Sequence, residues 1–230
     1  MKTLAMNIYS LRLTAILFSA GLYLAASSVN AQTYTRYDAQ PAGSKVKIEG
    51  DSSFHEWSMN GSIITGSFEI DSAAKIDTAE KTIAGLSGGK VNARAQAGIP
   101  IRSIKSGKTS MDSAMQDAMN QKTFPKIEYR LTELVLKDTP HAAGTPFQFD
   151  SKGELSMNGT TNKISMPVTI DRVDSSKLKI DATIPLKMTS FGIKPPTLSI
   201  LGLGAIKTDD NVKINVSWLV AQPEKAAEAK

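Results

Sequence analysis

The chain has 230 residues, a formal net charge of +5, two histidines and no cysteine. Without cysteine it can form neither a disulfide framework nor a thiolate metal cluster. Its lysines and arginines are spread singly and aromatic residues make up only 6% of the chain, whereas a nucleic-acid-binding surface needs clustered basic residues with interleaved aromatics. Composition therefore excludes these classes and indicates a single globular domain with a sizeable core.

The N-terminal segment has the pattern of an export signal. Lys2 and Arg12 precede an apolar run over residues 13–26, and residues 29–31 read Val-Asn-Ala, a small-x-small cleavage pattern. A membrane anchor is the competing interpretation, but the run is shorter than the roughly 20 residues of a spanning helix and serines dilute it. We expect a signal peptide at 1–31, a folded domain at 32–222 and a flexible tail at 223–230. The expected location is periplasmic or secreted, and the protein is not expected to span a membrane.

Apolar and polar residues alternate with period two after the signal segment, which is typical of strands with one buried and one wet face. Val46 and Ile48 mark the first expected strand, and a second covers residues 64–70. A longer strand is expected over residues 91–101, where every odd-numbered position is small or apolar.

One segment has helical periodicity instead. Between residues 109 and 121, Met111, Met115 and Met119 recur at every fourth position, with Ser110 as the expected N-cap. The pattern predicts a short amphipathic helix in a long connection between strands, ended by Phe124 and Pro125.

The alternation resumes after this helix. Ile127, Tyr129 and Leu131 share one parity, which then changes to Leu134 and Leu136, as a β-bulge requires.

Further strands are expected over residues 147–157, 164–170, 178–188 and 212–220. Asn158 and Gly159 supply the two positive-φ residues of a tight hairpin turn, and Pro185 marks an edge or a bulge. The pattern gives about eight strands joined mostly by short turns, and hence mostly antiparallel.

Strict alternation in every strand favours closure of the sheet into a barrel, because closure removes exposed edges. A transmembrane barrel would turn its apolar face outward and carry aromatic girdles. Here aromatics are few and the polar faces are rich in lysine, aspartate and glutamate, which suit bulk water. We therefore expect an all-β, eight-stranded antiparallel barrel with its apolar face inside and a short helix in one connection.

The sequence offers little catalytic chemistry. His55 and His141 are its two histidines, and His55-Glu56 lacks the second histidine of a zinc-protease helix. No residue spacing argues for a Ser-His-Asp triad, and the glycine-rich stretches 85–89 and 202–204 lack the strand-to-helix context of a phosphate loop. We expect no enzyme activity, no metal site and no resident cofactor.

Two features are candidates for ligand binding. Phe54, His55 and Trp57 cluster between two expected strands, either as a packed corner in which His55 satisfies a backbone carbonyl or as a ligand contact. The methionines of the expected helix, with others on apolar strand faces, are either ordinary core or the soft lining of a pocket for a flexible ligand.

The motif Gly-Glu-Leu-Ser-Met-Asn-Gly-Thr-Thr-Asn-Lys-Ile at residues 153–164 resembles the Gly-x-Leu-x-x-x-Gly-x-Thr-x-x-Val signature of the YceI-like family, bacterial lipocalin-like polyisoprenoid-binding proteins. Residues 111–127 resemble the family's helix and the strand after it, residues 190–193 its Asp-Phe-Gly turn, and residues 44–70 its opening hairpin. The family's usual histidine and arginine in the helix are methionine and alanine here, and the Phe-His-Glu-Trp stretch at 54–57 marks a subgroup.

The resemblance implies an eight-stranded barrel that holds an isoprenoid chain, such as an isoprenoid quinone tail, in its lumen, usually after export. The residues predicted to bind the ligand are Phe54, Trp57, Ile64, Phe68, Met111, Met115, Met119, Phe124, Ile127, Tyr129, Phe149, Met166, Met188 and Phe191.

Three functional hypotheses follow. The first is a carrier or store for an apolar lipid. The second is an exported interaction module whose barrel is filled by its own side chains. The third is an enzyme acting on a lipid headgroup, which would need a polar cluster near His55.

Overall fold

The computed structural model describes residues 32–77, 82–84, 86, 89–137, 145–200 and 204–224. The expected signal peptide, His141, parts of both glycine-rich stretches and most of the expected tail lie outside these residues. Within the described part of the chain, no helix is both long and apolar enough to cross a membrane.

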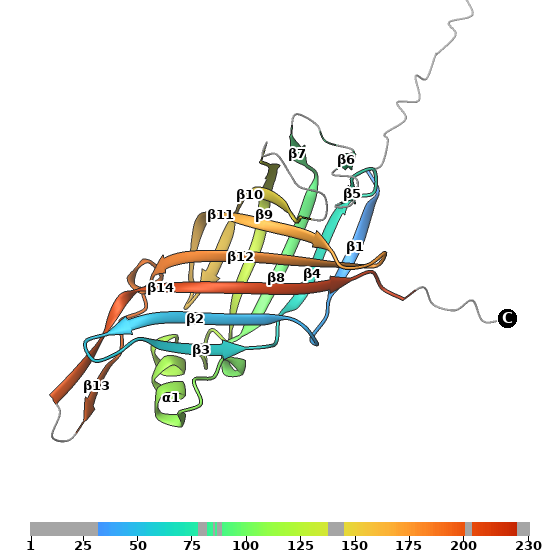
Figure 1. Cartoon of the computed structure of the whole chain (residues 1–230). Coiled ribbons are helices and arrows are strands. Elements are labelled where there is room, and N and C mark those ends of the chain that lie inside the picture. The colour runs from blue at the N-terminus through green and yellow to red at the C-terminus, as the bar shows by residue number, and fades with distance from the viewer. Residues whose placement is uncertain are drawn as a thin grey trace, which may run out of the picture. The chain divides into compact units, whose positions relative to one another are not determined.

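Eight strands form the ring of the barrel (Figure 1): β1 (Tyr34–Ala39), β4 (Thr65–Asp71), β8 (Ala93–Pro100), β9 (Lys126–Leu136), β10 (Phe147–Met157), β11 (Thr160–Arg172), β12 (Lys177–Lys187) and β14 (Gly204–Ala221). All neighbours pair antiparallel in this order. The ring closes where Asp38 and Ala39 of β1 lie opposite Ala221 and Val220 of β14. The predicted eight-stranded antiparallel barrel is confirmed.

Shorter elements extend the wall at the two ends. The hairpin of β2 (Lys45–Ser52) and β3 (Trp57–Gly61) pairs with β14, as does β13 (Thr197–Ile200). At the other end β7 (Lys90–Val91) pairs with β9, while β5 (Lys75–Asp77) and β6 (Thr82–Ala84) form a small separate sheet. The helix α1 (Thr109–Ala118) lies at the same end as β13, and this end is called the α1 end below (Figure 1).

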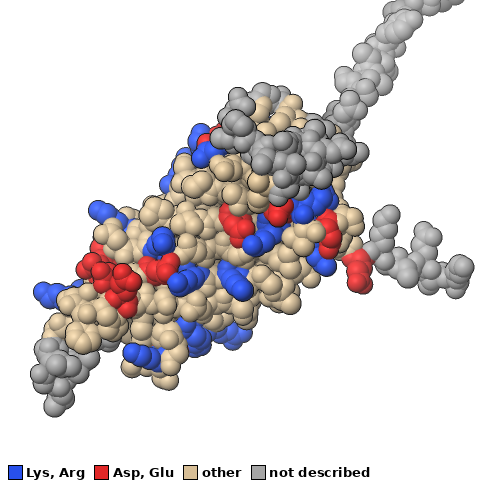
Figure 2. Space-filling model, in the orientation of Figure 1, with Lys and Arg blue, Asp and Glu red and all other residues tan. Residues whose placement is uncertain are grey.

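The apolar faces of the strands point into the barrel, as predicted. In β10, Phe147, Phe149, Leu155 and Met157 are buried together with Ser151 and Gly153, whereas the residues of the other parity are exposed or half-buried. Lysine, arginine, aspartate and glutamate are scattered with mixed sign over the outer face in Figure 2. Each large apolar side chain moved from water to the interior stabilises the fold by roughly 1.5–3 kcal/mol, so the alternation itself drives closure.

Two local predictions are confirmed. The register between β9 and β10 passes from Glu133 to Leu131 and leaves Thr132 unpaired, which is the expected bulge at the change of parity. Asn158 and Gly159 have φ values of 50° and 74° and join β10 to β11 in a tight hairpin.

The set of ring strands differs from the prediction at one place. The strand expected around Val46 and Ile48 is β2, which adds to β14 at the α1 end, and the ring instead contains β1. Sequence periodicity misses β1 because Tyr37 is its only buried residue. β1 therefore lacks the alternating buried apolar residues that mark the other strands.

The helix is shorter than predicted, and its start is different. α1 ends at Ala118 rather than near residue 121, and its N-cap is Lys108, so the expectation of a Ser110 cap is wrong. Lys108 makes no side-chain capping bond. The start is held by Asp112, whose carboxylate accepts hydrogen bonds from the backbone N–H and the hydroxyl of Ser106, both at 2.7 Å.

This anchor depends on charge. The hydrogen bonds from Ser106 and the nearby ammonium of Lys105 lower the pKa of Asp112 below its ordinary value of 3.8. A carboxylate with a lowered folded-state pKa stabilises the fold above pH 3.8, and that contribution is lost as the pH falls through the lowered pKa. We expect Asp112→Asn to lower the melting temperature at neutral pH and to make little difference in acid. Thermal melts over a range of pH measure this effect. If the two proteins differ in melting temperature by the same amount at every pH, the charge does not anchor α1.

The wall is incomplete between β11 and β12. These strands pair only where Val168–Arg172 of β11 face Leu178–Ala182 of β12, so both separate toward the α1 end. Pro167 and Pro185 stand just beyond the paired stretch, which agrees with the edge role predicted for Pro185. The 3-10 helix η2 (Met188–Phe191) fills the gap, and the Asn162 side chain of β11 donates to its Ser190 carbonyl at 2.7 Å.

Candidate functional site

The barrel interior contains two cavities. The inner cavity has a volume of about 100 Å³ and lies inside the ring, with walls from β4, β8, β9, β10, β11, β12 and β14. The mouth cavity has a volume of about 270 Å³ and lies at the α1 end. Ile127 and Ile214 line both cavities, so the two spaces meet at these side chains. Together they amount to about 370 Å³, within the lower part of the roughly 300–1,000 Å³ of ligand pockets.

The inner cavity exists because several inward positions carry small side chains. Ala95 and Ala97 of β8 and Ala182 of β12 line it, where larger residues would fill the lumen. The remaining wall is mostly branched and aromatic, and no lysine, arginine, aspartate or glutamate lines it within the described chain. This space suits an uncharged and mostly apolar occupant.

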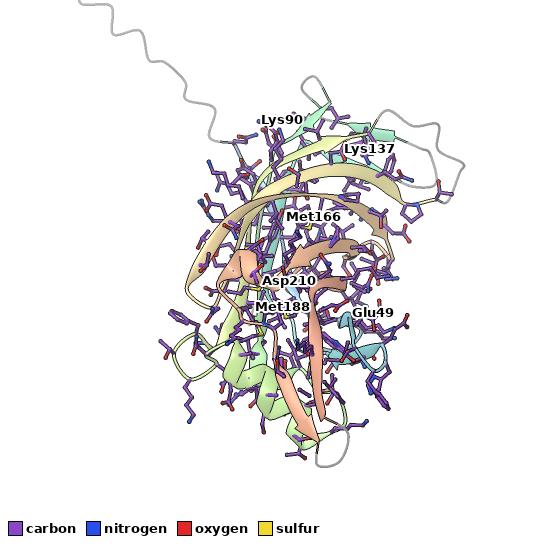
Figure 3. All side chains as sticks on the ribbon, turned by 90° about the vertical axis from the view of Figure 1, so that its left-hand side faces the viewer. Glu49, Lys90, Lys137, Met166, Met188 and Asp210 are labelled. Carbon is purple, nitrogen blue, oxygen red and sulfur yellow. The ribbon has the colours of Figure 1, made fainter. Side chains whose placement is uncertain are left out.

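The mouth cavity is lined by methionines from several elements: Met59, Met111, Met115, Met119, Met157 and Met188. Flexible thioethers adapt to an irregular or bending occupant. Its polar residues are Ser52, His55, Lys108, Ser110, Lys187 and Thr208. Figure 3 shows Met166 of the inner cavity and Met188 of the mouth cavity at two levels of the barrel interior.

η2 is held in place from its outer side. Asp210 of β14 accepts hydrogen bonds from the Thr189 backbone N–H at 2.8 Å and the Thr189 hydroxyl at 2.7 Å. These bonds lower the pKa of Asp210. They fix the short helix so that Met188 and Phe191 face the mouth cavity.

Most of the predicted ligand-binding residues line one of the two cavities. Those at the inner cavity are Ile64, Phe68, Ile127, Tyr129 and Met166. Those at the mouth cavity are Trp57, Met111, Met115, Met119, Ile127, Met188 and Phe191. The methionine stripe of α1 therefore faces open space rather than only packed core, although its contact with a ligand stays a prediction.

The structure places three predicted residues elsewhere. Phe54 is 67% exposed at the β2–β3 turn, where its ring lies edge-on to that of His55 at a centroid distance of 5.4 Å. Phe124 is 38% exposed, and its ring covers Gly159. Phe149 is fully buried as core and lines neither cavity. Apolar character alone does not reveal on which side of a turn a ring lies.

The corner of His55 and Trp57 has the backbone contacts of the first interpretation left open by the sequence. The Trp57 indole N–H donates to the carbonyl of Asp51 at 3.0 Å, and its ring lies against Gly50. His55 Nδ1 lies 2.7 Å from the carbonyl of Glu56, so the imidazole satisfies a backbone oxygen. Trp57 is half-buried and His55 is exposed, and both line the mouth cavity, while their contact with a ligand stays a prediction.

Sequence reasoning missed Trp218, Ser151 and the alanines of the inner cavity. Trp218 lies on the inward face of the predicted strand 212–220, so parity could have found it. Within the described residues, no group of three or more histidines, aspartates or glutamates is arranged to hold a metal ion.

A closed antiparallel barrel with an apolar interior is the architecture of the lipocalin-like proteins. Residues 37–219 match the model of the YceI-like domain, and the chain belongs to this family. It is similar to BcnA of Burkholderia cenocepacia, with 18% identity, a TM-score of 0.55, and coverage of 79% of this chain and 99% of that one.

A second similar structure is a polyisoprenoid binding domain from Saccharophagus degradans implicated in plant cell wall breakdown. It has 14% identity, a TM-score of 0.57, and coverage of 84% of this chain and 99% of that one. At such identities the likeness shows the fold. No curated protein matches the chain.

Proposed function

We propose that this chain is an exported binding protein that holds an isoprenoid or another apolar lipid in the barrel, for carriage or storage. The observation that carries the proposal is the pair of cavities that meet at Ile127 and Ile214, with apolar walls over most of their surface. The polyisoprenoid binding domain from S. degradans has the same fold, which supports an isoprenoid chain such as a quinone tail as the occupant.

Binding by partition needs no catalytic group and no resident cofactor. Each methylene group moved from water into the barrel contributes roughly 0.8 kcal/mol, so about ten carbons contribute roughly 8 kcal/mol before the costs of association. The alternative is an exported interaction module with a self-filled barrel. The unfilled volume of about 270 Å³ at the mouth favours the carrier.

Intact-mass spectrometry of protein purified from the periplasm of its host tests both parts of the proposal. The denatured mass should correspond to a chain that begins at Gln32, as expected for cleavage after Ala31. The native mass should be larger by one lipid, which organic solvent removes. A chain that retains Met1 in the inner membrane would overturn export, and a native mass without any lipid would favour the interaction module.

A further inference from the structure

Two polar side-chain atoms in the inner cavity have no hydrogen-bond partner among the described residues: the indole Nε1 of Trp218 and the hydroxyl oxygen of Tyr129. Trp218 is only 4% exposed, so water at the molecular surface does not reach its N–H group. A buried donor without an acceptor destabilises a protein, and such groups are rare unless a ligand or an enclosed water meets them. Both residues line the inner cavity.

The two donors come from opposite sides of the barrel. Trp218 lies on β14 and Tyr129 on β9, and in the ring of eight strands three others separate β9 from β14 in either direction. Both donors therefore face the same inner cavity. The Ser151 hydroxyl, also at this cavity, already donates to the carbonyl of Met166 at 3.0 Å.

Tyr129 can donate a hydrogen bond at physiological pH, as any phenol with an ordinary pKa of 10.0 can. Burial raises the pKa of this phenol further, and the nearby Ser151 hydroxyl offsets part of the rise. The ring lies across Gly153, where a Cβ atom would come within 2.4 Å of it. Because Gly153 has no side chain, it leaves room for the Tyr129 ring at the cavity wall.

We propose that the inner cavity binds the headgroup of the lipid, and that this headgroup is uncharged and carries an oxygen acceptor such as a ketone, quinone or amide carbonyl. The acceptor would receive hydrogen bonds from Trp218 and Tyr129 while the apolar tail runs past Ile127 to the methionines of the mouth. This inference rests on the proposed function and adds the orientation and chemical class of the ligand.

An anionic headgroup does not suit the inner cavity. A phosphate or carboxylate there would be buried without a cation, since no lysine or arginine lines this space within the described chain, and burial of an unpaired charge is strongly unfavourable. Lys108 and Lys187 stand at the mouth cavity instead. A charged lipid would therefore have to bind in the opposite orientation, with its headgroup at the mouth.

Three farnesyl probes separate these orientations: the ketone farnesylacetone, the hydrocarbon farnesane and farnesyl phosphate. The full mature protein gives two indole N–H signals in ¹⁵N nuclear magnetic resonance spectra, because it has two tryptophans. Trp57 serves as the internal reference because its N–H already donates to Asp51. We expect farnesylacetone to move the Trp218 signal downfield and slow its hydrogen exchange, whereas farnesane shifts it much less and both probes affect Trp57 equally.

Affinities measured by calorimetry provide the second test. Trp218→Phe and Tyr129→Phe should each weaken farnesylacetone binding by roughly two- to tenfold more than they weaken farnesane binding, because only the ketone loses a net hydrogen bond. If farnesylacetone binds with an unchanged Trp218 signal, or if farnesyl phosphate binds more tightly and responds to Lys108→Gln, the inference is wrong while lipid binding stands. If none of the three probes binds, the proposed function itself fails.

Discussion

Met115→Lys is expected to weaken the binding of an isoprenoid lipid by about tenfold or more, because it places a charged group in the path of the apolar tail. Met115 is half-buried on α1 and lines the mouth cavity between Met111 and Met119. From this position the lysine can extend its ammonium toward solvent, so the free energy of unfolding should fall by less than roughly 1.5 kcal/mol. Lipid copurification and denaturant unfolding measure the two effects.

Asp117→Lys is the matched control. Asp117 lies on the same helix but is exposed and does not line the mouth cavity, so the variant should bind lipid as the unmodified protein does. Severe unfolding of Met115→Lys would instead show that the methionine stripe is plain core. If Met115→Lys has both a normal free energy of unfolding and undiminished lipid binding, the tail does not pass α1.

Gly66→Ala is expected to lower the free energy of unfolding by on the order of 4 kcal/mol, the largest stability loss we predict for a single methyl group. Gly66 on β4 has a φ of 113°, where L side chains are strained. A Cβ atom there would also lie 1.9 Å from the backbone carbonyl oxygen of Gln96 on β8. Since that neighbour is backbone, the two strands would have to separate, and both form the wall of the inner cavity.

Gly107→Ala separates the two causes in Gly66→Ala. Gly107 also has a positive φ, of 81°, but an added Cβ atom would meet nothing within 4 Å. Gly107→Ala should therefore lower the free energy of unfolding only through backbone strain, by roughly 1–2 kcal/mol. Denaturant unfolding of both variants gives the difference. Equal losses would mean that β4 and β8 can accommodate the methyl group.

Much of the barrel could be predicted because the period of two is a property of the extended backbone. Once one face must be buried, the apolar parity of a strand fixes which side chains point inward and excludes one-residue shifts in register, and a change of parity such as that near Thr132 requires a bulge. The same logic fails for β1, which buries only Tyr37. A strand that contributes mainly backbone hydrogen bonds leaves no mark in the apolar pattern.

The candidate site could be predicted less completely. Parity shows that the methionines and Tyr129 face inward, but whether an inward residue borders space or fills it depends on the residues across the barrel. Ala95 and Ala182 leave space near Trp218, whereas Phe149 meets neighbours that fill its surroundings. The start of α1 was missed because Asp112 bonds to Ser106 across a loop, a contact that the local capping pattern does not contain.

The prolines beside the gap between β11 and β12 have a consequence for the protein in a crowded compartment. Where two strands separate, each presents unpaired backbone groups that a strand of another molecule could extend into an aggregate. Pro167 and Pro185 have no N–H group, so neither edge offers a continuous row of donors. An incoming strand would therefore find the hydrogen-bond ladder interrupted on both sides of the gap, in addition to η2, which occupies the space between β11 and β12.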